Sequence, residues 1–301
     1  MPRLVRSRLA SMCCALLALI VVAGILVSCG GSKSTSATQV ISNIAGSWEF
    51  VAISNNGSTT GIEVALKEGQ VLVNGVQQPD GQIAASNTQI AFVSLNTVSQ
   101  NLNATGFGGS CQPVTTSNSL GPGSVTAANA PLVFTFTENG NVFNVNGTLG
   151  ADAQSLPLGT YTAQSGNSCT DTGGSMTGKI VPKLSGSYTG QICPLGSTSA
   201  CQSFSDTVNP ATLTENSSGV ATLTLLLSGT DNATFTMSGP VMGNAFFVQG
   251  IFQGQNLSFY GYSEQVFDST LQTNVPSVYL VNTTNPAQPF YVGTLAVPQT
   301  P

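Results

Sequence analysis

Leu132-Val133-Phe134-Thr135-Phe136-Thr137, then Glu138-Asn139-Gly140-Asn141, then Val142–Leu149 form the stretch that decides the fold class of this chain. Apolar and polar residues alternate on both sides of a segment that contains Asn-Gly, which is a strong short-range signal for a β-hairpin. Val220–Leu227 shows the same alternation after a turn at 216–219, with leucines on one face and threonines on the other. We therefore expect antiparallel pairs of strands in both halves of the chain.

The composition extends this expectation to the whole chain. Only 6% of the residues are charged, and Thr, Val, Gly, Asn and Ser are abundant, which favours strands over helices. Pro79-Asp80-Gly81 is predicted to be a turn from its residue chemistry. The sequence predicts an all-β fold of antiparallel β-sandwich or β-barrel domains. Besides those above, the expected strands are Ser47–Ile53, Ile62–Lys67, Gln70–Val76, Gln89–Leu95, Leu158–Ala163, Met176–Val181, Ala211–Glu215, Ala245–Gln253, Asn256–Ser263, Ser277–Asn282 and Phe290–Val297.

An internal similarity divides this pattern into two related copies. Ser185-Gly186-Ser187-Tyr188 matches Ala45-Gly46-Ser47-Trp48, and Ala233–Thr236 matches Val133–Phe136. We expect one β-domain over residues 44–183, with a long loop at 101–130, and a second over 184–301. One large sandwich whose strands share a composition is the alternative.

The N-terminus has the pattern of an export signal, with Arg3, Arg6 and Arg8 before an uncharged run from Ala10 to Val27. An uncleaved membrane anchor is the alternative, because about 18 uncharged residues can just span a bilayer.

The run ends in Leu26-Val27-Ser28-Cys29, which resembles the lipobox of bacterial lipoproteins. The resemblance implies a signal peptide over 1–28, a diacylglyceryl group on the Cys29 sulfur, usually a further acyl chain on its amine, and a flexible tether over 29–43. Gly30, in place of Asp, implies the outer membrane if the source is Gram-negative. The cell envelope, reached through this lipid, is the expected location.

Cleavage would change the charge of the protein. Three of the seven basic residues are the arginines of the signal, so the mature chain keeps four lysines against all twelve acidic residues, a net charge of −8. It has no arginine and no histidine. Nucleic acid is therefore excluded as a partner, because no basic patch could neutralise phosphates.

The remaining cysteines outside the signal are Cys111, Cys169, Cys193 and Cys201. An even number of cysteines in an exported chain predicts disulfides, and three pairings are possible. A two-domain organisation favours Cys111–Cys169 and Cys193–Cys201, one disulfide in each half.

The sequence offers little for catalysis. The chain has no histidine for a Ser-His-Asp or Cys-His arrangement. Asp171-Thr172-Gly173 resembles the Asp-Thr-Gly of aspartic proteases, but Asp268-Ser269-Thr270 lacks the glycine that a second copy needs. We expect no catalytic residue that sequence can identify, no cofactor and no metal ion.

Three functions remain open at this stage. The first is a non-catalytic binding or structural protein whose partner is an envelope protein, a glycan or a small apolar ligand. The second is a lipocalin-like carrier. Gly46-Ser47-Trp48 resembles the Gly-x-Trp start of lipocalins, which implies an eight-stranded barrel that carries a small apolar ligand. The third is a hydrolase that uses two of the twelve acidic residues as a carboxylate pair. Tyr260 and Tyr262 with Phe259 could form a stacking platform for sugars, although strand aromatics usually belong to the core.

Overall fold

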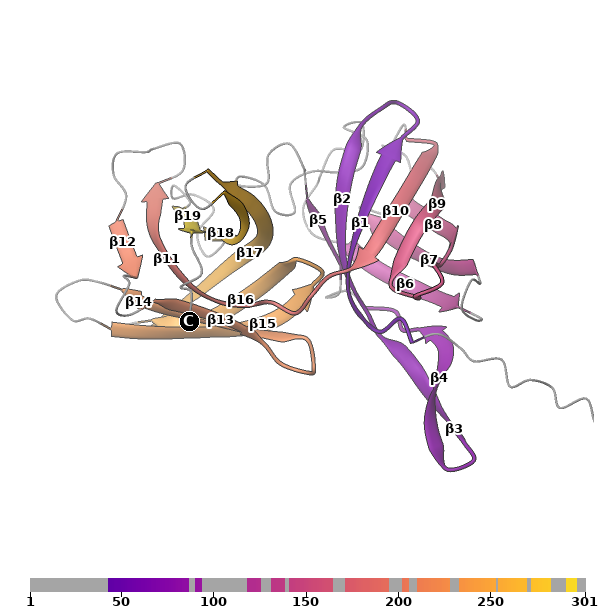
Figure 1. Cartoon of the computed structure of the whole chain (residues 1–301), viewed down its shortest axis with the longest axis horizontal. Helices are drawn as coiled ribbons and strands as arrows, with labels where there is room; N and C mark the ends of the chain where they lie inside the picture. Colours follow the sequence, from indigo (N-terminus) through magenta and orange to yellow (C-terminus); the bar gives the residue numbers. More distant parts are fainter. Residues whose placement is uncertain are drawn as a thin grey trace, which may run out of the picture. The chain divides into compact units, whose positions relative to one another are not determined.

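The computed structural model describes residues 43–86, 90–93, 118–125, 131–138, 141–164, 171–194, 202–205, 210–227, 233–252, 254–269, 272–282 and 291–296. All regular elements in these ranges are β-strands, arranged in two curled antiparallel sheets, which confirms the all-β prediction (Figure 1). Within the same ranges, no helix has the length and apolar character needed to cross a membrane. Ile41–Pro301 form one compact unit.

The first sheet contains the hairpin with which the sequence analysis began. Its strand order is β3-β4-β6-β7-β8-β9-β10-β1-β2-β5. β7 and β8 pair antiparallel with Glu138 opposite Asn141, so the predicted hairpin is confirmed. The strands are β1 (Gly46–Ser54), β2 (Thr59–Leu66), β3 (Glu68–Val73), β4 (Val76–Ile83), β5 (Ile90–Val93), β6 (Asn118–Val125), β7 (Pro131–Glu138), β8 (Asn141–Thr148), β9 (Ser155–Gln164) and β10 (Gly173–Ile180).

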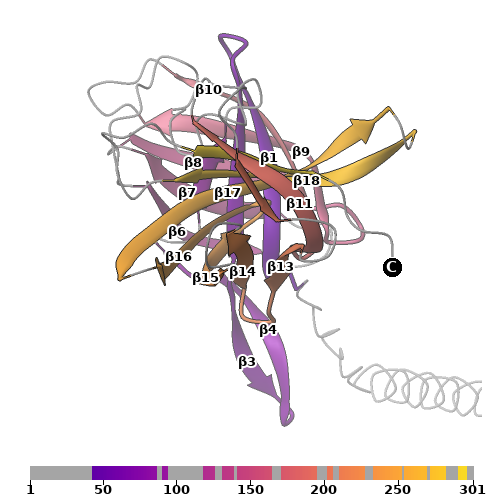
Figure 2. The same cartoon turned by 90° about the vertical axis from the view of Figure 1, so that its left-hand side faces the viewer.

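The second sheet follows the chain as a meander and closes on itself. Its order is β12-β11-β13-β14-β15-β16-β17-β18-β19, and a further antiparallel pairing joins β11 to β19. Figure 2 shows the long hairpin formed by β17 and β18. The strands are β11 (Ser185–Pro194), β12 (Gln202–Ser205), β13 (Ala211–Glu215), β14 (Val220–Leu227), β15 (Ala233–Met242), β16 (Ala245–Phe252), β17 (Gln255–Asp268), β18 (Thr273–Asn282) and β19 (Tyr291–Ala296).

Each sheet buries one face of its alternating strands in a core of its own. Trp48 stacks on Phe50 in the first core, with ring centroids 5.4 Å apart. In the second core Leu223 and Leu225 are buried, whereas Thr222 and Thr224 lie on the other face. Side chains at positions i and i+2 of a strand share a face, so the alternation seen in the sequence places these residues. The first core also contains Ile62, Val64, Phe134, Phe136, Phe143, Val145 and Tyr161, and the second Leu184, Tyr188, Leu213, Phe235, Phe246, Val248, Phe259 and Val278.

The two sheets begin in the same way, as the internal similarity predicted. Gly46 of β1 lies opposite Leu66, and Gly186 of β11 lies opposite Leu213. Before each first strand, a backbone N–H donates to a glutamate carboxylate at a distance of 2.9 Å. The two bonds are Ile44 N to Glu68 Oε2 and Leu184 N to Glu215 Oε2.

The buried aromatics of the two first strands also bond back to the segment before them. Trp48 Nε1 donates to the Ile44 carbonyl at 2.9 Å, and the Tyr188 hydroxyl donates to the Ser185 carbonyl at 3.3 Å. Trp48 is therefore an aromatic that closes one end of a β-core.

The predicted turn at Pro79-Asp80-Gly81 is wrong, because these residues belong to β4. The chain reverses earlier, at Asn74-Gly75, where φ values of 52° and 81° fit the two central positions of a type I′ turn. The Asn-Gly pair between two valines was the better signal. Gly81 has a φ of 74°, and the pairing of β3 with β4 shifts register opposite this segment, so Pro-Asp-Gly forms an irregularity within the ribbon.

The predicted loop at 101–130 contains a strand. β6 occupies Asn118–Val125 and pairs with β7, with a register shift between Leu120 and Gly123. Pro122 lies within that shift, and a proline is tolerated in a sheet where the ladder is interrupted in this way. Residues 101–117 and 126–130 lie outside the described residues.

Candidate functional site

Three charged side chains lie side by side on the outer face of the first sheet. Lys179 of β10 is opposite Glu49 of β1, and Glu49 is opposite Glu63 of β2. Their sequence neighbours Trp48 and Ile62 point into the core, so this row lies on the other face. Lys179 Nζ and Glu49 Oε2 form an ion pair at 3.0 Å.

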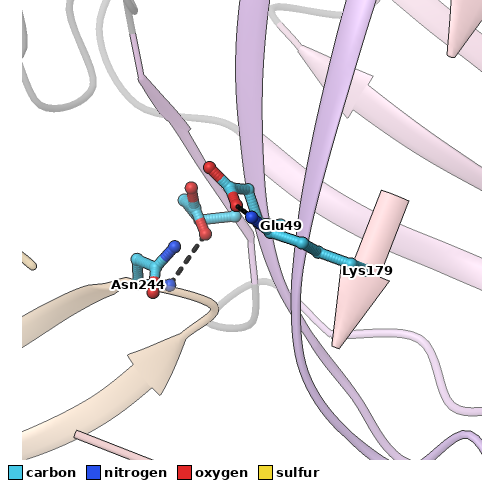
Figure 3. A network of polar contacts seen from close by, with 4 residues as sticks. Glu49, Lys179 and Asn244 are labelled. Carbon is cyan, nitrogen blue, oxygen red and sulfur yellow. Dashed lines mark hydrogen bonds and ion pairs between the residues drawn. The ribbon is translucent and has the colours of Figure 1, made fainter. Parts of the chain in front are cut away.

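Glu63 is fully buried, although it lies on the outer face. The turn Gly243-Asn244 between β15 and β16 of the second sheet covers it, and the Asn244 backbone N–H donates to Glu63 Oε2 at 2.7 Å. Figure 3 shows Asn244 opposite the Glu49–Lys179 ion pair. A single carboxyl group thus joins two segments that are 181 residues apart in the sequence.

Gly243 is required at this contact for two reasons. Its φ of 60° suits the first central position of a type II′ turn, where glycine is favoured. A Cβ at this position would also collide with the Glu63 carboxyl and with the Trp48 carbonyl oxygen. The turn therefore lies directly against the backbone of β1 and β2.

Burial dominates the electrostatics of Glu63. Loss of solvation raises its pKa well above the ordinary glutamate value, and the nearby Glu49 carboxylate raises it further. The Asn244 N–H and the Lys179 ammonium lower the pKa without cancelling this effect. The second carboxyl oxygen, Oε1, has no hydrogen-bond partner among the described residues. Glu63 thus holds its proton to a higher pH than an exposed glutamate does.

Aromatic side chains of the second sheet lie near this junction. Tyr262 packs with Ala91 of β5, Met242 and Ala245, and burial, followed by the Glu63 charge, raises the pKa of its hydroxyl. Tyr260 is half-buried against Phe247 at a centroid distance of 4.7 Å.

The stacking platform expected from Phe259, Tyr260 and Tyr262 does not form as a unit. Phe259 belongs to the core of the second sheet, whereas Tyr262 and the half-buried Tyr260 pack in the cluster on its other face. Neighbouring residues of a strand point to opposite faces, so Phe259 cannot share a surface with Tyr260 and Tyr262.

The Glu49–Glu63 pair has one property of a catalytic carboxylate pair, since its environment favours the neutral form of one member. A glycosidase also needs both carboxyl groups beside the substrate. Glu63 exposes no surface, and the second sheet covers it. In this conformation the arrangement serves to hold two sheets together.

Asp171 is also a residue that holds strands together. It is buried, and three groups donate to its carboxylate at 2.9 Å: the Ser54 hydroxyl, the Tyr161 hydroxyl and the Gly173 N–H. It therefore joins the end of β1 to β9 and β10. The printed sequence offers no second Asp-Thr-Gly copy, and the hydrogen-bond partners of the Asp171 carboxylate given above are two hydroxyls and a backbone N–H.

Most of the cysteines identified in the sequence analysis lie outside the described residues. These are Cys29, Cys111, Cys169 and Cys201. Cys193 lies in β11 opposite Val292, but its side chain is not described. The disulfides and the lipidation of Cys29 stay predictions. In the described part of the chain, no group of three or more Cys, Asp or Glu residues is placed to hold a metal ion.

Sequence reasoning missed the junction itself. Glu63 is the single charge in the apolar run Gly61–Ala65, and Gly243-Asn244 is a two-residue turn signal between apolar strands. Each signal was visible alone, but nothing in the sequence connects them. No known protein family and no curated protein matches the chain, so no relative supplies that connection either.

Proposed function

We propose that this protein is a lipid-anchored component of the bacterial cell envelope whose β-rich body acts by binding or as a scaffold, without catalysis. The lipobox-like Leu26-Val27-Ser28-Cys29 motivates the anchor. The absence of an aspartate after Cys29 favours the outer membrane if the cell is Gram-negative. An export route also suits the four remaining cysteines, which pair readily in an oxidising compartment.

One observation supports a non-catalytic body: the buried and half-buried carboxylates act as cross-links. Glu63 binds Asn244 of the other sheet, Glu68 binds Ile44 and Gly81, and Glu215 binds Leu184. Each accepts a backbone N–H from a segment distant in the sequence. Carboxylates used in this way fix strand ends and turns, and their hydrogen bonds compete with contacts to a substrate.

A lipocalin-like carrier is the second candidate, because the β11–β19 pairing closes the second sheet. A carrier needs room inside the closed sheet for a ligand. The described interior positions hold large side chains, among them Tyr188, Phe235 and Phe246. This filling favours a solid body over a carrier, and the scaffold is therefore our first proposal.

The anchor is tested by Cys29→Ser, with Cys14→Ser as a matched control within the signal. We expect Cys29→Ser to lose incorporation of labelled fatty acid and to leave the membrane fraction, whereas Cys14→Ser keeps both. Label and membrane attachment that persist in Cys29→Ser would overturn the anchor. Turnover of a chromogenic glycoside that Glu49→Gln abolishes would contradict the non-catalytic body.

A further inference from the structure

β3 and β4 form a two-stranded ribbon that extends beyond the first sheet (Figures 1 and 2). β3 is the edge strand, and β4 joins the rest of the sheet through Gln82 and Ile83, which pair with β6. In the described ranges, the ribbon from Gln70 to Pro79 therefore pairs only with itself. An isolated two-stranded hairpin is marginally stable in water, so a projecting one is an unusual feature of a folded domain.

The end of this ribbon is apolar and uncharged. Val71, Leu72 and Val76 expose 45%, 62% and 57% of their surfaces, and they flank the Asn74-Gly75 turn. The residues from Gln70 to Pro79 include no charged side chain, although exposed strand edges are commonly protected by charges. Val71 and Val76 lie on one face of the ribbon and Leu72 on the other. The projecting tip thus exposes aliphatic side chains on both faces, which indicates a contact made end-on with an apolar partner.

The root of the ribbon is the point where the tether joins the body. Ile44, at the start of the folded body, donates its backbone N–H to Glu68 Oε2 at 2.9 Å, and Gly81 of β4 donates to Glu68 Oε1 at 3.1 Å. Glu68 is the first residue of β3. Its carboxylate thus holds together the incoming chain and both strands of the ribbon.

Chain lengths relate the tip to the lipid. The tip lies about 17 Å from the root, from the rise of an antiparallel strand over the six residues of β3. The fifteen residues from Cys29 to Asn43 are rich in Gly, Ser and Thr, and a linker of that composition and length is expected to have an end-to-end distance of about 20 Å. Tip and lipidated cysteine therefore reach similar distances from one point, and the tip can touch the bilayer without extending the tether.

We propose that Val71, Leu72 and Val76 insert into the lipid surface of the membrane that holds Cys29, as a second contact beside the lipid anchor. This inference rests on the proposed anchoring. Because the anchor keeps the tip close to the bilayer, a weak apolar contact is effectively intramolecular and suffices. The net charge of the body gives no attraction to anionic lipids, so the contact is apolar and independent of lipid charge.

The test uses the full lipidated protein in phosphatidylcholine vesicles with brominated acyl chains, which quench tryptophan only on contact. Trp48 is the single native tryptophan and is buried, so the wild type supplies a constant background. Leu72→Trp places a probe at the tip. Leu158→Trp is the matched control, since Leu158 is 74% exposed on β9 of the same sheet, away from the ribbon.

We expect brominated lipid to reduce the added emission of Leu72→Trp at least twofold relative to unbrominated vesicles, and to leave that of Leu158→Trp unchanged. The quenching is expected to be the same with and without anionic lipid. Equal or absent quenching in the two variants would overturn the insertion. A tip shielded only when a second protein is added would also overturn it, in favour of a protein partner.

Flotation with the vesicles separates the two proposals. A protein that floats and carries the lipid mass on Cys29 but shows no quenching at position 72 retains the anchor and loses the membrane-inserting tip. A protein without lipid on Cys29 that does not float contradicts the anchor itself.

Discussion

Replacement of Glu63 tests whether one buried carboxyl joins the two sheets. Glu63→Gln keeps an oxygen that can accept the Asn244 N–H, now 2.7 Å from Glu63 Oε2, and removes the titrating proton. Glu63→Ala removes both the acceptor and the proton. The two variants therefore separate the hydrogen bond from the charge.

The sign of the pH effect follows from the raised pKa of Glu63. The folded protein binds this proton more tightly than the unfolded chain does. The contribution of Glu63 to stability is therefore complete below the ordinary glutamate pKa of 4.5 and is lost as pH rises toward the raised value. Within that window the free energy of unfolding falls by up to about 1.4 kcal/mol per pH unit from this group.

The expected magnitudes follow. At pH 4.5, Glu63→Gln should unfold within about 1 kcal/mol of the wild type, because a neutral amide replaces a neutral acid of the same shape. It should become progressively more stable than the wild type as pH rises. Glu63→Ala should lose about 1–3 kcal/mol at pH 4.5, since it leaves the buried Asn244 N–H without an acceptor.

The assay is urea denaturation, monitored through the fluorescence of Trp48. Trp48 is the single tryptophan, it is buried, and its carbonyl oxygen lies against Gly243 at the junction. Comparing variants at each pH removes the contributions of other groups, such as Glu68, whose pKa burial also raises. A stability difference between Glu63→Gln and the wild type that stays constant from pH 4.5 to 9 would refute the reasoning.

Two further substitutions test neighbouring contacts. Gly243→Ala should destabilise the protein by about 1–3 kcal/mol more than Gly219→Ala. Both positions have positive φ, but only a Cβ at position 243 would meet other atoms. Equal losses of unfolding free energy in urea would contradict the close approach. Asp171→Asn should lower the free energy of unfolding by about 1–3 kcal/mol, because three donors lose their carboxylate acceptor, and Tyr161→Phe should lower it less. Thermal unfolding at unchanged pH measures both variants. An Asp171→Asn variant as stable as the wild type would show that this network does not stabilise the fold.

Alternation along the chain predicted most of the fold because burial of one strand face is a local property. The hairpin at 131–148 and the leucine face of β14 could be identified for this reason. The ends of β3 and β4 could not, because Asn74-Gly75 and Pro79-Asp80-Gly81 both have turn chemistry and only the first reverses the chain. Turn chemistry has several solutions for one segment, and the pairing of the flanking strands decides between them.

Glu63 shows why the contact between the two sheets could not be predicted from the sequence. In the two-residue period of β2, Ile62 and Val64 occupy the core face, so Glu63 points to the outer face. An outer face is ordinarily exposed to solvent, but here Glu63 is buried. A second sheet covers the outer face through a contact across 181 residues, and local periodicity contains no information on such a contact.

Comparison of the two copies shows where the first one differs. Glu68 and Glu215 occupy equivalent places, each two residues after the leucine that lies opposite Gly46 or Gly186. Each is bonded to the segment before the first strand of its sheet. After Glu215 the chain turns at once, through Asn216–Gly219, into β14. After Glu68 it first makes the β3–β4 ribbon.

The second copy receives the short linker from the first sheet at this point, whereas the first copy would receive the proposed tether. The additional ribbon thus belongs to the copy that the proposed tether would join, and it starts at the residue that binds Ile44 at the start of the folded body. The ribbon is not needed to form the core of such a repeat, since the second copy forms its core without an equivalent ribbon after Glu215. Its position beside Ile44, where the proposed tether would enter, is therefore better explained by the membrane contact that we propose than by the stability of the sheet.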